Sequence, residues 1–97
     1  MARFDVHRVR GTLLLNVQAD EVDHLPSRVV VPLLPHAGPL PPLAALTPVF
    51  ELEGARVTMM THYLTAVPRR ELGRAVANLG AERDAITYAL DMLLTGF

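Results

Sequence analysis

Asp23, His24 and Ser27 lie close together, and Ser27 is the only serine in the sequence. An acid, a base and a nucleophile of these types form the catalytic set of many hydrolases. Such a set is assembled from separate structural elements that fix the direction of each partner. These three residues instead surround Pro26 in a segment typical of a turn, where Asp and Ser form hydrogen bonds to the backbone. We therefore interpret the segment as structural and predict no catalytic residues here.

The remaining chemistry-bearing residues also lack a catalytic or metal-binding spacing. The four histidines have neither i, i+4 spacing nor a neighbouring carboxylate motif, so we predict no metal; they are His7, His24, His36 and His62. A metal-independent ribonuclease needs a general base, a general acid and a cation that binds the phosphate. His62 together with Arg56 or Arg28 offers residues of these types. Their spacing does not single them out, so this arrangement stays an alternative. Cysteine is absent, which excludes disulfides and thiolate catalysis, and no cofactor is predicted.

The length and apolar content predict one domain and a partner subunit. The 97 residues suffice for one hydrophobic core, so we predict a single domain over residues 1–97. Apolar residues make up 51% of the sequence, more than a domain of this size readily hides. We therefore expect part of this surface to be covered in a homodimer.

Charge and hydropathy argue against nucleic-acid binding and against a transmembrane helix. The formal net charge is −1, every basic residue is an arginine, and no basic stripe is present, so we predict no direct nucleic-acid binding. The uncharged run over residues 29–50 contains six prolines, which exclude a transmembrane helix. The first residues have no apolar signal core, so we expect a cytoplasmic protein.

Alternating apolar and polar residues predict strands in the first two thirds of the chain. Strands are expected over residues 4–9 and 13–18, as a hairpin around Gly11, and over 28–31, where Pro32 indicates an edge or a bulge. A second hairpin is expected from residues 49–52 and 56–64, with Gly54 at positive φ in the turn. The proline-rich residues 35–48 between them are typical of an irregular loop.

The last third of the chain has helical character. After Pro68, a short helical segment is expected over residues 69–79, weakened by Gly73. Residues 81–94 have an apolar face at i, i+4 and i+7 spacing, formed by Ile86, Leu90 and Leu93, which predicts an amphipathic helix. Gly96 is a favourable helix stop.

Phe97 follows this stop as an apolar residue at a position where polar residues are usual. Two interpretations remain open. Phe97 is either a plug that folds back onto the sheet, or an exposed anchor for another protein, a role for which aromatic residues are favoured.

The order and spacing of several short segments resemble the CcdB family, the toxin half of toxin-antitoxin pairs that poison DNA gyrase. The resemblance covers nearly the whole chain, in Val17-Gln18 with Asp20 and Asp23, Val30-Val31-Pro32-Leu33, Met59-Met60-Thr61, Val67-Pro68, Leu72-Gly73, Val76, Leu79, Ile86 and Gly96 followed by an apolar residue. It implies a mainly β fold, an SH3-like β-barrel of the CcdB/MazF type with a small additional sheet and a C-terminal helix, and a two-fold homodimer.

The resemblance also implies a function and a set of contact residues. The implied function is that of a toxin of a type II toxin-antitoxin system, which binds the A subunit of DNA gyrase and is neutralised by a CcdA-like antitoxin. Carried over residue by residue, the gyrase-binding set is Val22, Asp91, Leu94, Thr95, Gly96 and Phe97. Several of these depart from the family pattern. The best-known members have Trp where Thr95 stands, Asn where Asp91 stands, and two isoleucines where this chain has Glu21-Val22.

Two alternatives remain beside gyrase poisoning. The first is an endoribonuclease similar to the MazF toxins, whose fold resembles that of CcdB. The second is a homologue that binds only its antitoxin.

Overall fold

The computed structural model describes residues 1–37 and 44–96 of the protein. Seven strands, four short 3-10 helices and one α-helix follow one another in the described chain: β1 (Asp5–Val9), β2 (Thr12–Asn16), η1 (Asp20–Val22), β3 (Ser27–Pro35), β4 (Val49–Leu52), β5 (Ala55–Met59), η2 (Thr61–Tyr63), β6 (Thr65–Pro68), η3 (Arg69–Glu71), β7 (Ala75–Asn78), η4 (Gly80–Glu82) and α1 (Arg83–Thr95). Within the described residues no helix is long and apolar enough to cross a membrane.

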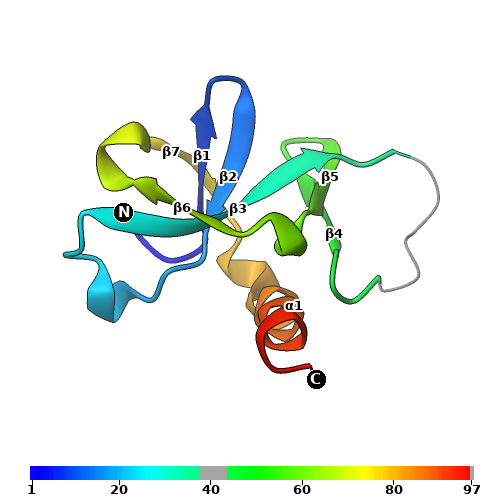
Figure 1. Cartoon of the computed structure of the whole chain (residues 1–97). Helices are drawn as coiled ribbons and strands as arrows, with labels where there is room; N and C mark the ends of the chain where they lie inside the picture. Colours follow the sequence, from blue (N-terminus) through cyan, green and yellow to red (C-terminus); the bar gives the residue numbers. More distant parts are fainter. Residues whose placement is uncertain (38–43, 97) are drawn as a thin grey trace.

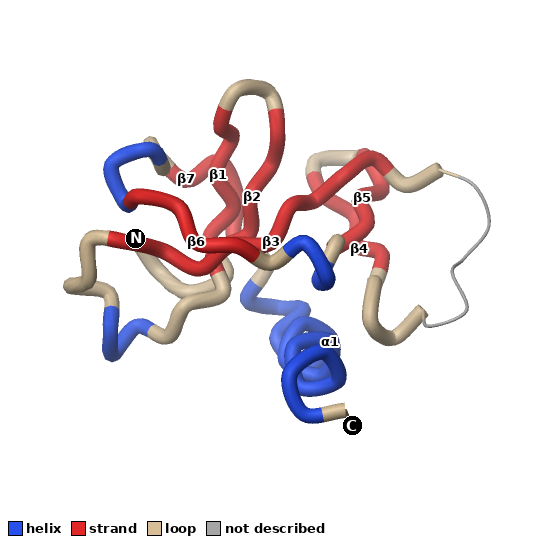
Figure 2. The backbone as a smooth tube through the Cα atoms, viewed as in Figure 1, coloured by secondary structure: helices blue, strands red, loops and turns tan. Residues whose placement is uncertain are grey.

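The strands form one antiparallel sheet in the order β4-β5-β3-β2-β1-β7, and β6 pairs with the first half of β3. The sheet curls into a half-barrel, and α1 projects from one side of it (Figures 1 and 2). The small additional sheet expected from the family resemblance is not separate among the described residues, because the β4–β5 hairpin is hydrogen-bonded to the end of β3 and belongs to the same sheet. The predicted fold class, mainly β with a C-terminal helix, is therefore confirmed.

Both predicted hairpin turns are present. Arg10 and Gly11 connect β1 to β2 with φ of 52° and 82°, and Glu53 and Gly54 connect β4 to β5 with φ of 53° and 82°. Two consecutive positive φ values are the mark of type I′ turns, whose twist matches that of the flanking strands. Glycine at the second position of each turn accounts for the tight two-residue connections.

The third strand is longer than the sequence predicts and runs through Pro32. On one side β3 pairs with β2 along residues 30–33; on the other its partner changes from β6, at Val30, to β5, at Leu33. Pro32 lies at this change of partner, where a missing backbone N–H interrupts no strand pair. Its carbonyl oxygen accepts a hydrogen bond from the Met60 backbone nitrogen (2.9 Å).

Two secondary-structure predictions are wrong. The strand expected over residues 56–64 ends at Met59, where the chain turns through η2 before continuing as β6. The helix expected over residues 69–79 is instead the single turn η3 followed by β7, which pairs with the edge of β1. Gly73 and the β-branched Val76 disfavour a helix here, and the unpaired edge of β1 offers the backbone groups of β7 their hydrogen-bond partners.

The core lies between the curled sheet and α1. Ile86, Ala89 and Leu90 of α1 are buried in one cluster with Phe4, which precedes β1, and with strand residues, chiefly Val6, Leu15, Val31, Leu33, Phe50, Val57 and Met59. The amphipathic helix predicted over residues 81–94 is therefore confirmed, with its first residues forming η4 instead. Burial of this face orients α1 so that its opposite face points to solvent.

Candidate functional site

The solvent-facing side of α1 brings together two of the predicted contact residues and one that the sequence did not indicate. Tyr88, Asp91 and Thr95 are spaced at i, i+3 and i+7, so they share one face of the helix. All three are exposed, Tyr88 to 52%, and they lie opposite the buried Ile86 and Ala89. We define the outer face of α1 as Tyr88, Asp91, Leu94 and Thr95.

The C-terminal end of α1 presents an apolar side chain on a well-defined backbone. Leu94 is 70% exposed, which gives it the largest exposed fraction among the large apolar residues of the described chain. The Thr95 hydroxyl donates to the Asp91 carbonyl oxygen (2.6 Å). Gly96 has φ of 83° and its N–H donates to the Met92 carbonyl oxygen (3.1 Å), so it ends the helix as predicted. Phe97, which was also predicted to contact the partner, lies outside the described residues.

Val22 belongs to a different element from the other predicted contacts. It is the last residue of η1 and is 37% exposed. In Figure 1 the η1 turn and α1 lie on the same side of the sheet. A hollow of about 370 Å³ separates the two elements and is lined by Asp20 and Glu21 of η1, Arg83 of α1, and Arg3 and Phe4. The structure therefore places Val22 on an element separate from the outer face of α1, and its neighbours Asp20 and Glu21 share a hollow with Arg83, the first residue of α1.

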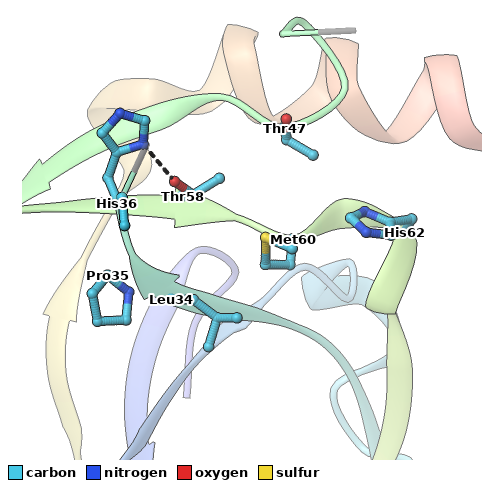
Figure 3. Close-up of a pocket in the computed structure, with 8 residues that line it drawn as sticks. Leu34, Pro35, His36, Thr47, Thr58, Met60 and His62 are labelled. Carbon is cyan, nitrogen blue, oxygen red and sulfur yellow. Dashed lines mark hydrogen bonds between the residues drawn. The ribbon is translucent and has the colours of Figure 1, made fainter. Parts of the chain in front are cut away.

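A second hollow, of about 400 Å³, contains two of the four histidines. His36 and His62 stand at opposite sides of it, with Thr58 and Met60 between them (Figure 3). The Nδ1 atom of His36 is hydrogen-bonded to the Thr58 hydroxyl (3.0 Å). The imidazole of His62 is exposed, with its ring centroid 4.2 Å from that of Tyr63. The hollow therefore has two candidate proton-transfer groups, but no arginine is among its described lining residues.

Neither arginine considered as the phosphate-binding cation of a ribonuclease is among the described residues that line the hollow of His62. Arg28 is buried, and its guanidinium donates to the backbone carbonyl oxygens of Asp23, Leu25 and Ser27. Arg56 is exposed and borders a separate hollow next to the β1–β2 turn. A base, an acid and a phosphate-binding cation are therefore not assembled around His62 within residues 1–37 and 44–96.

The other early candidates also lie in structural positions. Asp23 and His24 are exposed in the connection between β2 and β3, and Ser27 is exposed as the first residue of β3. No hydrogen bond joins their side chains in the part of the chain that the structure describes. His7 is buried and its Nδ1 is hydrogen-bonded to the Gly73 carbonyl oxygen (2.9 Å). The described residues contain no group of three or more His, Cys, Asp or Glu side chains that could hold a metal ion.

Comparison with protein-family models shows to which family this chain belongs. The family model described as CcdB protein matches residues 3–96, nearly the whole chain. The chain belongs to the CcdB family. The resemblance in the short segments from Val17 to Gly96 is therefore confirmed, and with it the membership in a family of toxin-antitoxin toxins. No curated protein sequence matches this chain significantly.

Two solved structures share the fold. One is described as the crystal structure of an Mtb toxin, with a TM-score of 0.71 and 18% identity over 88% of this chain and 94% of that chain. The other is an endoribonuclease in complex with its cognate antitoxin from a mycobacterial species, with a TM-score of 0.77 and 18% identity over 97% of this chain and 94% of that chain. At this identity both comparisons show the fold of the CcdB-family chain.

Tyr88 is the residue of the outer face that sequence analysis missed. Its signal was present in the helical periodicity, because Tyr88 precedes Asp91 by three residues and Thr95 by seven. An aromatic side chain with few rotatable bonds is favoured at protein interfaces. In this CcdB-family chain, Tyr88 gives the outer face an aromatic group one turn before Asp91.

Proposed function

We propose that this protein is a toxin of a type II toxin-antitoxin system that binds and poisons the A subunit of DNA gyrase. The observation that carries the proposal is the outer face of α1. Asp91, Leu94 and Thr95 occupy positions for which the family resemblance implies gyrase contacts, and they are exposed together on a helix whose opposite face is anchored in the core. A rigid, exposed face of this kind suits protein recognition because little conformational entropy is lost when it binds.

The composition of the outer face supports binding despite the missing tryptophan. Losing a central aromatic anchor commonly costs about 2 kcal/mol or more of binding free energy, a factor of roughly 30. Leu94 and Tyr88 offer exposed apolar and aromatic area at the end and in the middle of the same face. We propose that these two side chains replace part of the contact that Thr95 no longer provides.

Neutralisation by a CcdA-like antitoxin is the second part of the proposal. The family resemblance implies an antitoxin for each toxin, and one structure of the same fold is of an endoribonuclease in complex with its cognate antitoxin. A disordered antitoxin segment that folds on binding covers a large surface for its length. Coexpression of the cognate antitoxin is expected to restore growth.

A gyrase cleavage assay tests the central claim. Purified protein is incubated with gyrase, ATP and supercoiled DNA, and linear DNA is measured after denaturation of the complex. Accumulation of linear DNA above the gyrase-only level supports poisoning. A normal level, with intact binding to the antitoxin, would instead assign the chain to the homologues that bind only their antitoxin.

We further propose that the protein acts without catalysis. Replacing His62 with alanine is expected to leave growth inhibition and cellular RNA unchanged, because no phosphate-binding cation is among the described residues that line the hollow of His62. Growth curves and RNA gels of cells expressing each form measure this. The matched control is Glu71→Ala, which removes an exposed polar side chain from another single-turn 3-10 helix, η3. RNA degradation that disappears only in His62→Ala would favour the ribonuclease alternative.

The functional form is proposed to be a homodimer. The apolar content of 51% and the two-fold pairing implied by the family resemblance support this assembly. Sedimentation at micromolar concentration is expected to give about twice the mass of 10.6 kDa. A single monomeric species at that concentration would contradict the two-fold mode of gyrase binding that the family resemblance implies.

A further inference from the structure

Hydrogen bonds hold the backbone of residues 19–27, which comprise the last part of the connection between β2 and β3 and the first residue of β3. Gln18 Nε2 donates to the Val22 carbonyl oxygen (2.9 Å), and Gln18 Oε1 accepts from the Val29 N–H (2.9 Å). Gln18 therefore bridges the loop and the strand that follows it. The Arg69 N–H donates to the Pro26 carbonyl oxygen (2.7 Å). We name residues 19–27 the clamped loop.

Arg28 is the centre of this clamp. Its side chain is only 1% exposed, and its Nη1 donates to the carbonyl oxygens of Leu25 (3.0 Å) and Ser27 (2.9 Å) while Nη2 donates to that of Asp23. The Asp23 carbonyl oxygen also accepts from Arg69 Nη1 (3.1 Å). In the described chain the Arg28 guanidinium is paired with carbonyl groups and not with a carboxylate. A buried cation is costly unless its donors are satisfied, so movement of these carbonyls away from Arg28 is strongly disfavoured.

Several side chains of the clamped loop are exposed to solvent. Val22 and Leu25 are 37% and 40% exposed, and His24 and Pro26 between and beside them are exposed too. The loop thus bonds several of its carbonyl groups to Arg28 and exposes Val22 and Leu25 beside the polar side chains of the same segment. An apolar group held in one position binds a partner with little loss of conformational entropy, which favours tight association.

We propose that Leu25 joins Val22 as a contact residue for the gyrase A subunit, and that Arg28 and Gln18 are positioning residues that hold both side chains outward. This inference rests on the proposed function. The geometry of the loop supports the same partner, because the Leu25 N–H donates to the Val22 carbonyl oxygen (3.3 Å) within one turn of the chain. A partner surface that contacts Val22 is therefore next to Leu25.

The contact is tested with Leu25→Ser and a matched control, Val76→Ser. Val76 is 43% exposed on β7, so the control removes a similar apolar area elsewhere on the molecule. The dissociation constant for the purified gyrase A subunit is measured by calorimetry. Leu25→Ser is expected to weaken binding about tenfold, as for an interface residue of intermediate importance, and Val76→Ser to leave it unchanged. Equal affinities of both variants and the wild type would remove Leu25 from the contact.

The positioning role is tested with Arg28→Met, which keeps the length of the side chain and removes its donors. In the free protein, the amides of Val22, Asp23 and Leu25 bond within the loop to the carbonyls of Ala19, Asp20 and Val22. Their hydrogen exchange is expected to accelerate about tenfold or more in Arg28→Met, because the clamp no longer opposes local opening. Unchanged exchange in a folded Arg28→Met protein would overturn the clamp.

A double-mutant cycle separates positioning from general stability. If Arg28 acts through the loop, the tenfold effect of Leu25→Ser shrinks to about twofold or less in the Arg28→Met background. A stability role alone would leave the two effects multiplicative, which would contradict the inference. Should Arg28→Met fail to fold, Arg69→Met provides the same comparison, because Arg69 is exposed and its side chain bonds only the Asp23 carbonyl among the loop groups.

The same measurements distinguish this inference from the proposed function. If the wild-type protein does not bind the gyrase A subunit, the proposed function fails and with it the assignment of Leu25 to that partner. Hydrogen exchange in the free protein then still decides whether Arg28 holds the clamped loop.

Discussion

Replacing Asp91 with arginine is expected to abolish gyrase poisoning while the protein remains fully folded. Asp91 is exposed at the centre of the outer face of α1, so the change reverses a charge and adds bulk at the proposed contact. Such a mismatch commonly costs about 2–5 kcal/mol of binding free energy, which is roughly thirtyfold or more in affinity. The gyrase cleavage assay, with thermal unfolding of the same sample, measures both effects.

The stability of Asp91→Arg provides an internal control. Asp91 lies near the C-terminal end of α1, where the helix dipole disfavours negative charge and favours positive charge. The melting temperature is therefore expected to stay constant or rise slightly. Asp91→Asn restores the residue of the best-known family members and is expected to keep or strengthen poisoning. If Asp91→Arg poisons gyrase as well as Asp91→Asn does, the outer face of α1 is not the contact surface.

Replacing Ile86 with alanine is expected to produce the largest loss of stability. Ile86 is fully buried on the inner face of α1, in the cluster that joins the helix to the sheet. Truncating a buried Ile or Leu to alanine costs about 2–5 kcal/mol. For a domain of this size the melting temperature is expected to fall on the order of 10–30 °C, at about 4–8 °C per kcal/mol. Thermal and denaturant unfolding measure the change.

Leu94→Ala is the matched control for Ile86→Ala. Both substitutions remove an aliphatic side chain from α1, but Leu94 is 70% exposed and contributes little to the core. Its effect on the free energy of unfolding is expected to stay within about 0.5 kcal/mol. Leu94→Ala is instead expected to weaken gyrase binding. Equal losses of stability in the two variants would mean that α1 does not bury the face containing Ile86.

Much of the fold was predictable because its signals are local. The two hairpins follow from alternating apolar residues on either side of Gly11 and Gly54, and α1 follows from the helical spacing of Ile86, Leu90 and Leu93. Gly96 as the helix stop is equally local. Each of these signals is contained within a few consecutive residues, so no knowledge of distant contacts is needed to interpret them.

The errors lie where a distant partner decides the local structure. β7 is a short strand of alternating exposure whose backbone is satisfied by the edge of β1, far away in the sequence. The break at Met60 between β5 and β6 depends on how both strands pair with β3. A single segment does not contain this information, because strand pairing is non-local.

In the candidate site, too, the sequence determined some features and the tertiary structure determined others. The sequence alone determined that Asp91, Leu94 and Thr95 lie together on one helix, since their spacing sets their relative directions. Only the tertiary structure decided that this face is exposed, because exposure depends on which face of α1 the sheet buries. The tertiary structure also decided that Arg28 is unavailable as a phosphate-binding cation, because packing buries its guanidinium among the carbonyl groups of the clamped loop. The sequence does not indicate which groups surround an arginine side chain.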